Sequence, residues 1–527
     1  MRKIIITVSI FISCIINIFP QWSTDPNNNL IVGYGQDPKI CSDSAGGCYI
    51  TYTYETTWYP QKLALERLDR YGYKPWGTLK QILGELPEQW QAEIVEDEEG
   101  GIIVSYQDNE WIPPSYYNSK VRVQKVDSVG NFLWGQTGVR VSLETVNHSG
   151  QHLVSDGDGG CIIIWGDWDG PVRINRINRL GQRVWGETGI QLASNHTNLS
   201  IVKVNDYKFY VQVDTIVFRI NQDGEIINQY NTTLGQIVPD SEGGLVLSNK
   251  VWTGMIPKLV SQRIDSLGNN LWQEPYVEIS DSLYINSQLE IQYNDGYYFY
   301  GWSGTKNGIN NVGQFQVLRE DGSKLFLGGS ISISENSPIG PPIIVPSEFG
   351  RTILIWNDAT IVSTTIAQLY DTLGNKLWDE NGVIVSYPAI AVETTTDGQG
   401  GFITMGPINQ FTIVVQQVNK NGKLGEIITS IELENDYSTH SQVTLFQNYP
   451  NPFNPTTKIS FAISKSSNIT LTVYDALGRK VSTLIDGFME AGNFSVIFDA
   501  SDLASGIYFY RLTSDTFSET KKMVLLR

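Results

Sequence analysis

Short apolar runs alternate with polar, glycine-rich segments along most of the chain, and no long stretch shows helical periodicity. Runs such as Ile102–Val104, Cys161–Trp165 and Phe402–Thr404 have the length of single β-strands, and each follows a polar segment that ends in two glycines. Aromatic residues make up 11% of the chain and glycines number 49, which favours pleated strands joined by tight turns. The pattern predicts an all-β protein.

A second motif repeats between these runs, and its clearest copy reads Gln-Arg-Ile-Asp-Ser-Leu-Gly-Asn-Asn-Leu-Trp at Gln262–Trp272. Each clear copy holds a turn aspartate, a turn glycine and a tryptophan at fixed spacing: Asp127, Gly130 and Trp134; Asp265, Gly268 and Trp272; Asp371, Gly374 and Trp378. Weaker copies centre on Gly72, Gly181, Gly224, Gly322 and Gly422. The eight turn glycines lie between 43 and 58 residues apart.

Each repeat predicts a sheet of about four short strands, which is too small to bury both of its faces alone. The aspartate accepts N–H bonds within a hairpin turn, the glycine tolerates positive φ, and the tryptophan packs against a neighbouring sheet. Sheets of this size stack around an axis in a β-propeller. We therefore expect a propeller over residues 28–430 with eight blades. Seven is the alternative, because the unit around Gly224 is short and lacks tryptophan.

The first residues differ in character from the body. Arg2 and Lys3 precede the apolar run Ile4–Phe19, so we expect residues 1–21 to be a cleaved signal peptide. We find no other segment that could span a membrane. The net charge of −18 argues against a nucleic-acid partner, which requires a basic surface.

Three cysteines follow the predicted signal peptide, and an exported protein can form disulfides. Cys48 and Cys161 stand where other copies of the repeat place an apolar core residue, which predicts buried thiols. A disulfide between Cys41 and Cys48 across a hairpin is the alternative. The spacing of these cysteines matches no metal-binding motif.

The repeats resemble those of secreted proteins from bacteria with type IX export, in which Asp-Gly-x-Gly-Gly and Gln-Arg-Ile-Asp-x-x-Gly-x-x-Leu-Trp recur. This resemblance covers most of residues 36–427. It implies a propeller and assigns no activity.

After a polar linker at residues 431–443, residues 444–527 have the pattern of a small β-sandwich. They resemble the type A C-terminal sorting domain of the type IX secretion system. The resemblance rests on Asn448, Tyr449, Pro450, Asn451, Pro452, Phe453, Asn454, Pro455, Gly478, Arg479, Gly506, Tyr508, Lys521 and Lys522. It implies recognition by the outer-membrane translocon of a Gram-negative bacterium, and secretion or attachment to the cell surface.

The sequence contains few residues that indicate chemistry. Asp156, Asp158, Asp167 and Asp169 are candidate oxygen ligands for Ca²⁺, although their spacing matches no recognised calcium loop. The alternative is that these aspartates only shape solvated turns. We identify no catalytic residue and no cofactor motif.

Aromatic residues in the inter-strand loops offer a binding face for carbohydrate or protein: Trp111, Trp168 and Trp252. We therefore expect a non-enzymatic binding or surface-display protein. The alternative is an extracellular hydrolase, a glycosidase or a peptidase, with acidic residues on the propeller axis.

Overall fold

The computed structural model forms two compact units, Met1–Glu426 and Ile427–Arg527. It describes residues 22–525 except 56–60, 78–79, 83–84, 113–115, 145–146, 168–169, 196–197, 206–207, 233–234, 241, 255, 281–283, 286–288, 307–309, 334–339, 359–362, 410, 426–442, 446–447, 449–452, 454, 464–466, 490–491, 502 and 515–517. Within these ranges, no helix has the length and apolarity that a membrane crossing requires.

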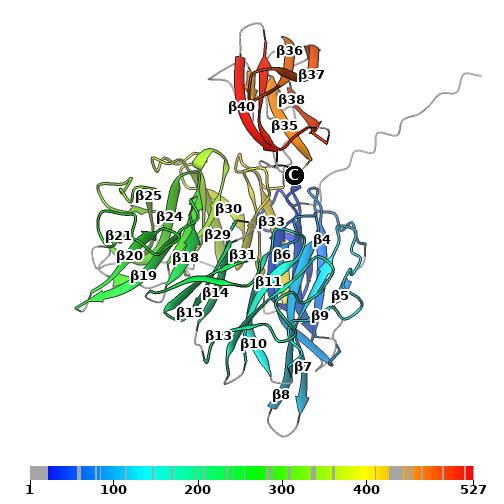
Figure 1. The fold of residues 1–527 in the computed structure, drawn as a ribbon. Coiled ribbons are helices and arrows are strands. Elements are labelled where there is room, and N and C mark those ends of the chain that lie inside the picture. Colours follow the sequence, from blue (N-terminus) through cyan, green and yellow to red (C-terminus); the bar gives the residue numbers. More distant parts are fainter. Residues whose placement is uncertain are drawn as a thin grey trace, which may run out of the picture. The chain divides into compact units, whose positions relative to one another are not determined.

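The described part of the larger unit contains eight antiparallel sheets, which we number as blades in chain order (Figure 1). Blades 1 to 4 consist of β2 (Gln36–Ser42), β3 (Cys48–Glu55), β4 (Gln61–Leu68) and β5 (Lys80–Ile82); β6 (Glu88–Glu96), β7 (Ile102–Ile112), β8 (Tyr116–Val126) and β9 (Val139–Arg140); β10 (His148–Ser155), β11 (Cys161–Asp167), β12 (Val172–Ile177) and β13 (Ile190–Ala193); and β14 (Leu199–Asn205), β15 (Lys208–Val213), β16 (Ile216–Asn221) and β17 (Ile226–Asn231).

The remaining blades follow the same plan. Blades 5 to 8 consist of β18 (Gln236–Pro239), β19 (Leu245–Thr253), β20 (Ile256–Ile264) and β21 (Val277–Glu278); β22 (Tyr284–Ile285), β23 (Glu290–Asn294), β24 (Tyr297–Lys306), β25 (Asn310–Arg319) and β26 (Ile331–Ser332); β27 (Ile343–Pro346), β28 (Thr352–Asp358), β29 (Thr364–Tyr370) and β30 (Val383–Ser386); and β31 (Glu393–Thr396), β32 (Phe402–Pro407), β33 (Thr412–Val418) and β1 (Leu30–Tyr34). A single 3₁₀ turn, η1 (Glu348–Gly350), is described between β27 and β28.

The blades form a closed ring. The first strands β2, β6, β10, β14, β18, β23, β27 and β31 contact one another in succession, and β31 contacts β2. Figure 1 shows the blue strands of blade 1 beside the yellow strands of blade 8. Closure protects the inner sheet edges from pairing with other chains. The structure confirms the prediction of an eight-bladed propeller.

Blade 8 joins the two ends of the propeller sequence. Its strand order is β1-β33-β32-β31, so β1 from the N-terminal side forms the outermost strand. Leu30 pairs with Val415 and Tyr34 with Thr412. The ring is therefore closed by backbone hydrogen bonds between segments from its two ends.

The repeated turn aspartates share one hydrogen-bond pattern. Oδ1 of Asp265 accepts the N–H groups of Leu267 (2.8 Å) and Asn269 (2.9 Å), and Gly268 donates its N–H to the Asp265 carbonyl. Gly268 has a φ of 87°, which favours glycine over any residue with a side chain. Asp127 and Asp371 make the same bonds at their own turns.

The tryptophan that follows each of these turns contacts the next blade. Trp272 Nε1 donates to the carbonyl oxygen of Glu320 at 2.9 Å, and its indole packs over the turn glycine Gly322. The same bond is made at five other interfaces, as Trp22 to Arg70, Trp76 to Ser128, Trp134 to Arg179, Trp185 to Gln222 and Trp378 to Lys420. We call these indoles the inter-blade pegs.

Blades 4 and 6 have other aromatic residues in this role. Tyr230 of blade 4 packs over the turn glycine Gly268, and Phe326 of blade 6 packs over Gly374. The short unit around Gly224 is therefore a complete blade, with its aromatic residue on β17 and not directly after the turn. The peg of blade 8 is Trp22, which lies at the other end of the propeller sequence.

All three cysteines of the propeller are free thiols in the structure. Cys48 and Cys161 are fully buried in inter-blade cores, and burial raises the pKa of each thiol. Both occupy the first position of a second strand, where the other copies of the repeat place apolar residues.

The second unit contains two sheets around one core. One sheet has the order β34 (Val443–Leu445), β35 (Thr456–Ile463), β38 (Gly492–Asp499), and the other β37 (Lys480–Met489), β36 (Ser467–Asp475), β39 (Gly506–Thr513), β40 (Ser518–Leu525). Phe461 of the first sheet and Tyr510 of the second belong to the same buried cluster. This arrangement is the sandwich that the alternation of apolar residues predicts.

Candidate functional site

The propeller has two ends with different contents. Because consecutive strands are antiparallel, the turns that join the first to the second strand and the third to the fourth strand lie at one end. We call this the repeat-turn end, because it carries the repeated aspartate turns. The hairpins that join the second and third strands lie at the opposite end, which we call the hairpin end.

Of the three tryptophans proposed as a ligand face, Trp111 and Trp252 lie on strands near the hairpin end. Trp252 lies near the end of β19, where its side chain is 66% exposed and Lys250 Nζ lies 5.6 Å from the ring centroid. Trp111 lies near the end of β7, opposite Tyr117, with its side chain outside the described residues. Trp168 lies outside the described residues.

The aspartates proposed as calcium ligands bond to protein groups where they are described. Asp156 Oδ1 accepts the N–H groups of Asp158 and Gly160, and Asp156 Oδ2 lies 2.8 Å from Arg176 Nε. The Asp158 side chain is exposed, and Asp169 lies outside the described residues. The described residues contain no group of three or more His, Cys, Asp or Glu side chains placed to hold a metal ion.

Asp167 belongs to a buried polar cluster between blades 2 and 3. Its Oδ1 lies 3.8 Å from His148 Nε2, and neither atom has a hydrogen-bond partner in the described part of the chain. Burial, with Lys120, Arg140 and Arg173 nearby, lowers the pKa of His148 to about 3, so this imidazole is neutral at physiological pH. Buried polar atoms of Asn109 also have no partner among the described side chains and backbone groups. Such groups carry a desolvation cost that a well-packed apolar interface avoids.

The innermost strands carry charged groups that join neighbouring blades. Lys39 of β2 lies 2.6 Å from Glu393 of β31, and His152 of β10 lies 2.8 Å from Glu93 of β6. The hydrogen bond to Glu93 raises the pKa of His152. These carboxylates are near the axis, where the hydrolase hypothesis places acidic residues, and each of the two forms an ion pair across a blade interface.

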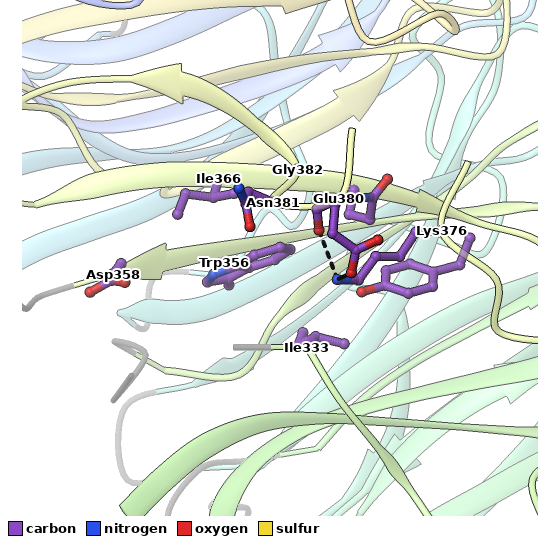
Figure 2. A pocket seen from close by; sticks show the side chains of 10 residues that line it. Ile333, Trp356, Asp358, Ile366, Lys376, Glu380, Asn381 and Gly382 are labelled. Carbon is purple, nitrogen blue, oxygen red and sulfur yellow. Dashed lines mark hydrogen bonds and ion pairs between the residues drawn. The ribbon is translucent and has the colours of Figure 1, made fainter. Parts of the chain in front are cut away.

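A pocket of about 180 Å³ opens between blades 6 and 7 (Figure 2). Trp356 and Ile366, which are cross-strand partners on β28 and β29, line it together with Ile333, which follows β26. Asp358 lies at one end of the pocket, and Lys376 and Glu380 form a 2.8 Å ion pair at the other. The pocket therefore has an apolar wall and a polar rim.

Tyr370 and Gln368 also line this pocket and are buried. Gln368 bonds to neighbouring backbone groups, because its amide nitrogen donates to Asp379 O and its oxygen accepts the N–H groups of Leu369 and Trp378. The Tyr370 hydroxyl has no hydrogen-bond partner among the residues that the structure describes, and burial raises its pKa.

Trp356 and Tyr370 are not among the site residues predicted from the sequence. An alignment of the eight repeat copies contains the signal, because Tyr370 directly precedes its turn. The other copies have an aliphatic residue there: Leu68, Val126, Ile177, Ile220, Ile264, Leu318 and Val418. Tyr370 is the exception.

The residues proposed for sorting lie on the second unit, where the described ones hold its sheets together. Asn448 is buried and donates its N–H to Tyr510 Oη at 2.7 Å, and the Phe453 N–H donates to Val524 O at 2.9 Å. Gly478 lies in the Asp475 turn that Arg479 closes, and Tyr508 Oη donates to Ala504 O.

Other residues of the proposed sorting motif are on the strands or outside the description. Gly506 begins β39, and Lys521 and Lys522 lie on β40. Pro455 is exposed ahead of β35. Tyr449, Pro450, Asn451, Pro452 and Asn454 lie outside the described residues.

Comparison with known families identifies this unit. Residues 447–526 match the model of the secretion system C-terminal sorting domain. The second unit is a sorting domain. The protein is thus exported by the type IX secretion system, and it is secreted or located at the surface of a Gram-negative bacterium. The sorting domain implies engagement with that secretion machinery.

Comparisons of the whole chain give weaker similarity. The β-propeller domain of the Trilobed protease from Pyrococcus furiosus is 7% identical, with 75% of this chain and 99% of that chain covered and a TM-score of 0.38. PorZ, a surface component of the type IX secretion system of Porphyromonas gingivalis, is 10% identical, with 95% and 100% covered and a TM-score of 0.17. No curated protein matches the sequence.

Proposed function

We propose that the propeller is a non-enzymatic binding module, exported by the type IX system, that binds carbohydrate or protein at its hairpin end. The observation that carries this proposal is Trp252, whose indole is 66% exposed near the tip of the β19–β20 hairpin. Lys250 lies over the ring and holds a cation beside this apolar surface. A large exposed aromatic side chain next to a charge suits stacking on a sugar ring or on a peptide.

The contents of the repeat-turn end support the choice of the hairpin end. Arg263 Nη1 and Trp272 Nε1 both donate to the carbonyl oxygen of Glu320 in the next blade, at 3.0 and 2.9 Å. Arg263 also pairs with the buried carboxylate of Asp240. Side chains that hold the ring together in this way leave little freedom for ligand recognition, whereas hairpin loops on a rigid scaffold can vary.

Glycan and peptide arrays probed with the full chain, with its leader removed, test the proposal. We expect binding to at least one class, and loss of about 90% of that signal in Trp252→Ala, as truncation of an aromatic anchor costs more than ~1.4 kcal/mol. Leu267→Ala is the matched control, because Leu267 is also 66% exposed on blade 5 but lies at the repeat-turn end. Equal loss in both variants, or none in Trp252→Ala, refutes a site at Trp252. Release of glycan or peptide fragments would favour the hydrolase.

A further inference from the structure

We propose that the pocket between blades 6 and 7 binds a single uncharged pyranose unit, such as the terminal sugar of a glycan. This inference rests on the proposed function in one respect, because it specifies a carbohydrate as the ligand. It concerns a different site from Trp252, so each of the two sites can be refuted without the other.

The pocket lies where the repeat departs from its own pattern. Blade 6 has Phe326 as its peg where most blades have tryptophan, and blade 7 has Tyr370 where every other copy has Leu, Ile or Val. A phenyl ring fills less space than an indole and carries no N–H donor. Both of these departures from the repeat, Phe326 and Tyr370, lie at the blade 6–blade 7 interface that contains the pocket.

Tyr370 gives this pocket a group that points to a ligand. Its side chain is only 1% exposed, and its hydroxyl has no hydrogen-bond partner among the described residues. A buried hydroxyl without a partner costs free energy that a bound hydroxyl group or water recovers. An aliphatic residue, as in the other copies, carries no such cost.

The size of the pocket suits one six-membered ring. Its volume is about 180 Å³, and a dry cavity of ~150 Å³ accommodates a benzene ring. A single sugar unit therefore fits, and the remainder of a longer glycan would have to lie outside the pocket.

The lining chemistry selects a hydroxyl-rich, uncharged ring. Trp356, Ile333 and Ile366 supply an apolar wall for the C–H face of a pyranose (Figure 2). Carboxylates of Asp358 and Glu380 accept hydrogen bonds from hydroxyls. With Lys376 as the only cation in the lining, the described pocket has one net negative charge, which disfavours acidic sugars.

Isothermal titration of the full chain, without its leader, with the methyl glycosides of glucose, galactose and mannose tests this inference. We expect at least one to bind, and Tyr370→Phe to weaken that binding about fivefold, the effect of one lost hydrogen bond. Tyr298→Phe is the matched control, because the Tyr298 hydroxyl is also buried, has no partner within the described ranges and does not line the pocket. It should bind like the wild type, and glucuronate should bind less tightly than methyl glucoside.

Two results overturn the inference. The first is the absence of binding by all three glycosides, which is the behaviour of a pocket that holds only water. The second is equal binding by Tyr370→Phe and the wild type. Trp252→Ala separates the two proposals, because this variant should still bind the methyl glycosides if the pocket is their site. Array binding that depends on Trp252, without glycoside binding, overturns the pocket alone.

Discussion

Replacing Trp22 by alanine tests the claim that the ring is held closed by a peg from the opposite end of the propeller sequence. The Trp22 side chain is 3% exposed, packs over Gly72, and donates Nε1–H to Arg70 O at 3.0 Å. Large-to-small replacement of a buried aromatic residue costs about 3–5 kcal/mol. The free energy of unfolding should fall by this amount in urea titrations followed by circular dichroism.

Trp252→Ala is the control for this measurement. It removes the same side chain from an exposed position, where the expected change is within ~0.5 kcal/mol. A loss in Trp22→Ala no larger than in the control would refute the reasoning, because it would mean that the ring closes without the peg. Trp272→Ala, which removes a peg in the middle of the ring, should cost as much as Trp22→Ala.

Three further predictions follow from other contacts. Removing residues 444–527 should leave the protein in the periplasm, as measured by cell fractionation, and normal secretion would contradict the sorting role. As the pH falls below ~6.5, His148 takes up a proton in the unfolded state, whereas its lowered pKa keeps the imidazole neutral in the folded state. Between pH 8 and pH 5 the wild type should therefore lose about 2 kcal/mol of unfolding free energy, and the His148→Gln variant should not show this loss. Parallel pH profiles of the two proteins in urea unfolding would exclude this effect. Arg263→Met removes the ion-pair partner of the buried Asp240 carboxylate and should lower the free energy of unfolding in urea by ~3–5 kcal/mol. Lys258→Met breaks the half-exposed pair with Glu278 and should cost less than ~1 kcal/mol. Similar losses in the two variants would refute this difference.

The sequence was sufficient to predict the propeller because its turns are specified by local chemistry. An aspartate followed three residues later by glycine, as at Asp265 and Gly268, forms a turn through bonds within five residues. Such a turn needs no information from the rest of the chain. Eight such units of similar length then require a closed arrangement to bury both sheet faces.

The repeat does not show which blade contains both ends of the propeller sequence. A circular array has the same period wherever the chain begins, so the spacing of turn glycines does not reveal which blade contains both ends. We expected the propeller to begin at residue 28, whereas the described structure has Trp22 packed against blade 1. A signal was present in the last copy, which reads Gly425-Glu426 where the clear copies have Leu-Trp.

The pocket depends on contacts between blades, which a single repeat does not encode. Trp356 was one of several aromatic residues on second strands, and only its position opposite Ile333 of the preceding blade makes it part of a wall. Whether the Tyr370 hydroxyl finds a hydrogen-bond partner likewise depends on which groups surround it. Long-range geometry of this kind determines binding sites, even where local sequence determines the scaffold.

The pairing of β1 with β33 in blade 8 links the folding of the chain to the closed ring. β1 pairs with β33, and Leu30 and Val415 are partners across almost the whole propeller sequence, so the ring can close only after blade 8 has been made. Pairing between distant segments is slow, although the equilibrium cost of a long loop grows only with the logarithm of its length. Trp22 adds a buried indole and a hydrogen bond to the adjoining interface with blade 1. The peg therefore reinforces the place at which an open ring would otherwise lose its terminal strand.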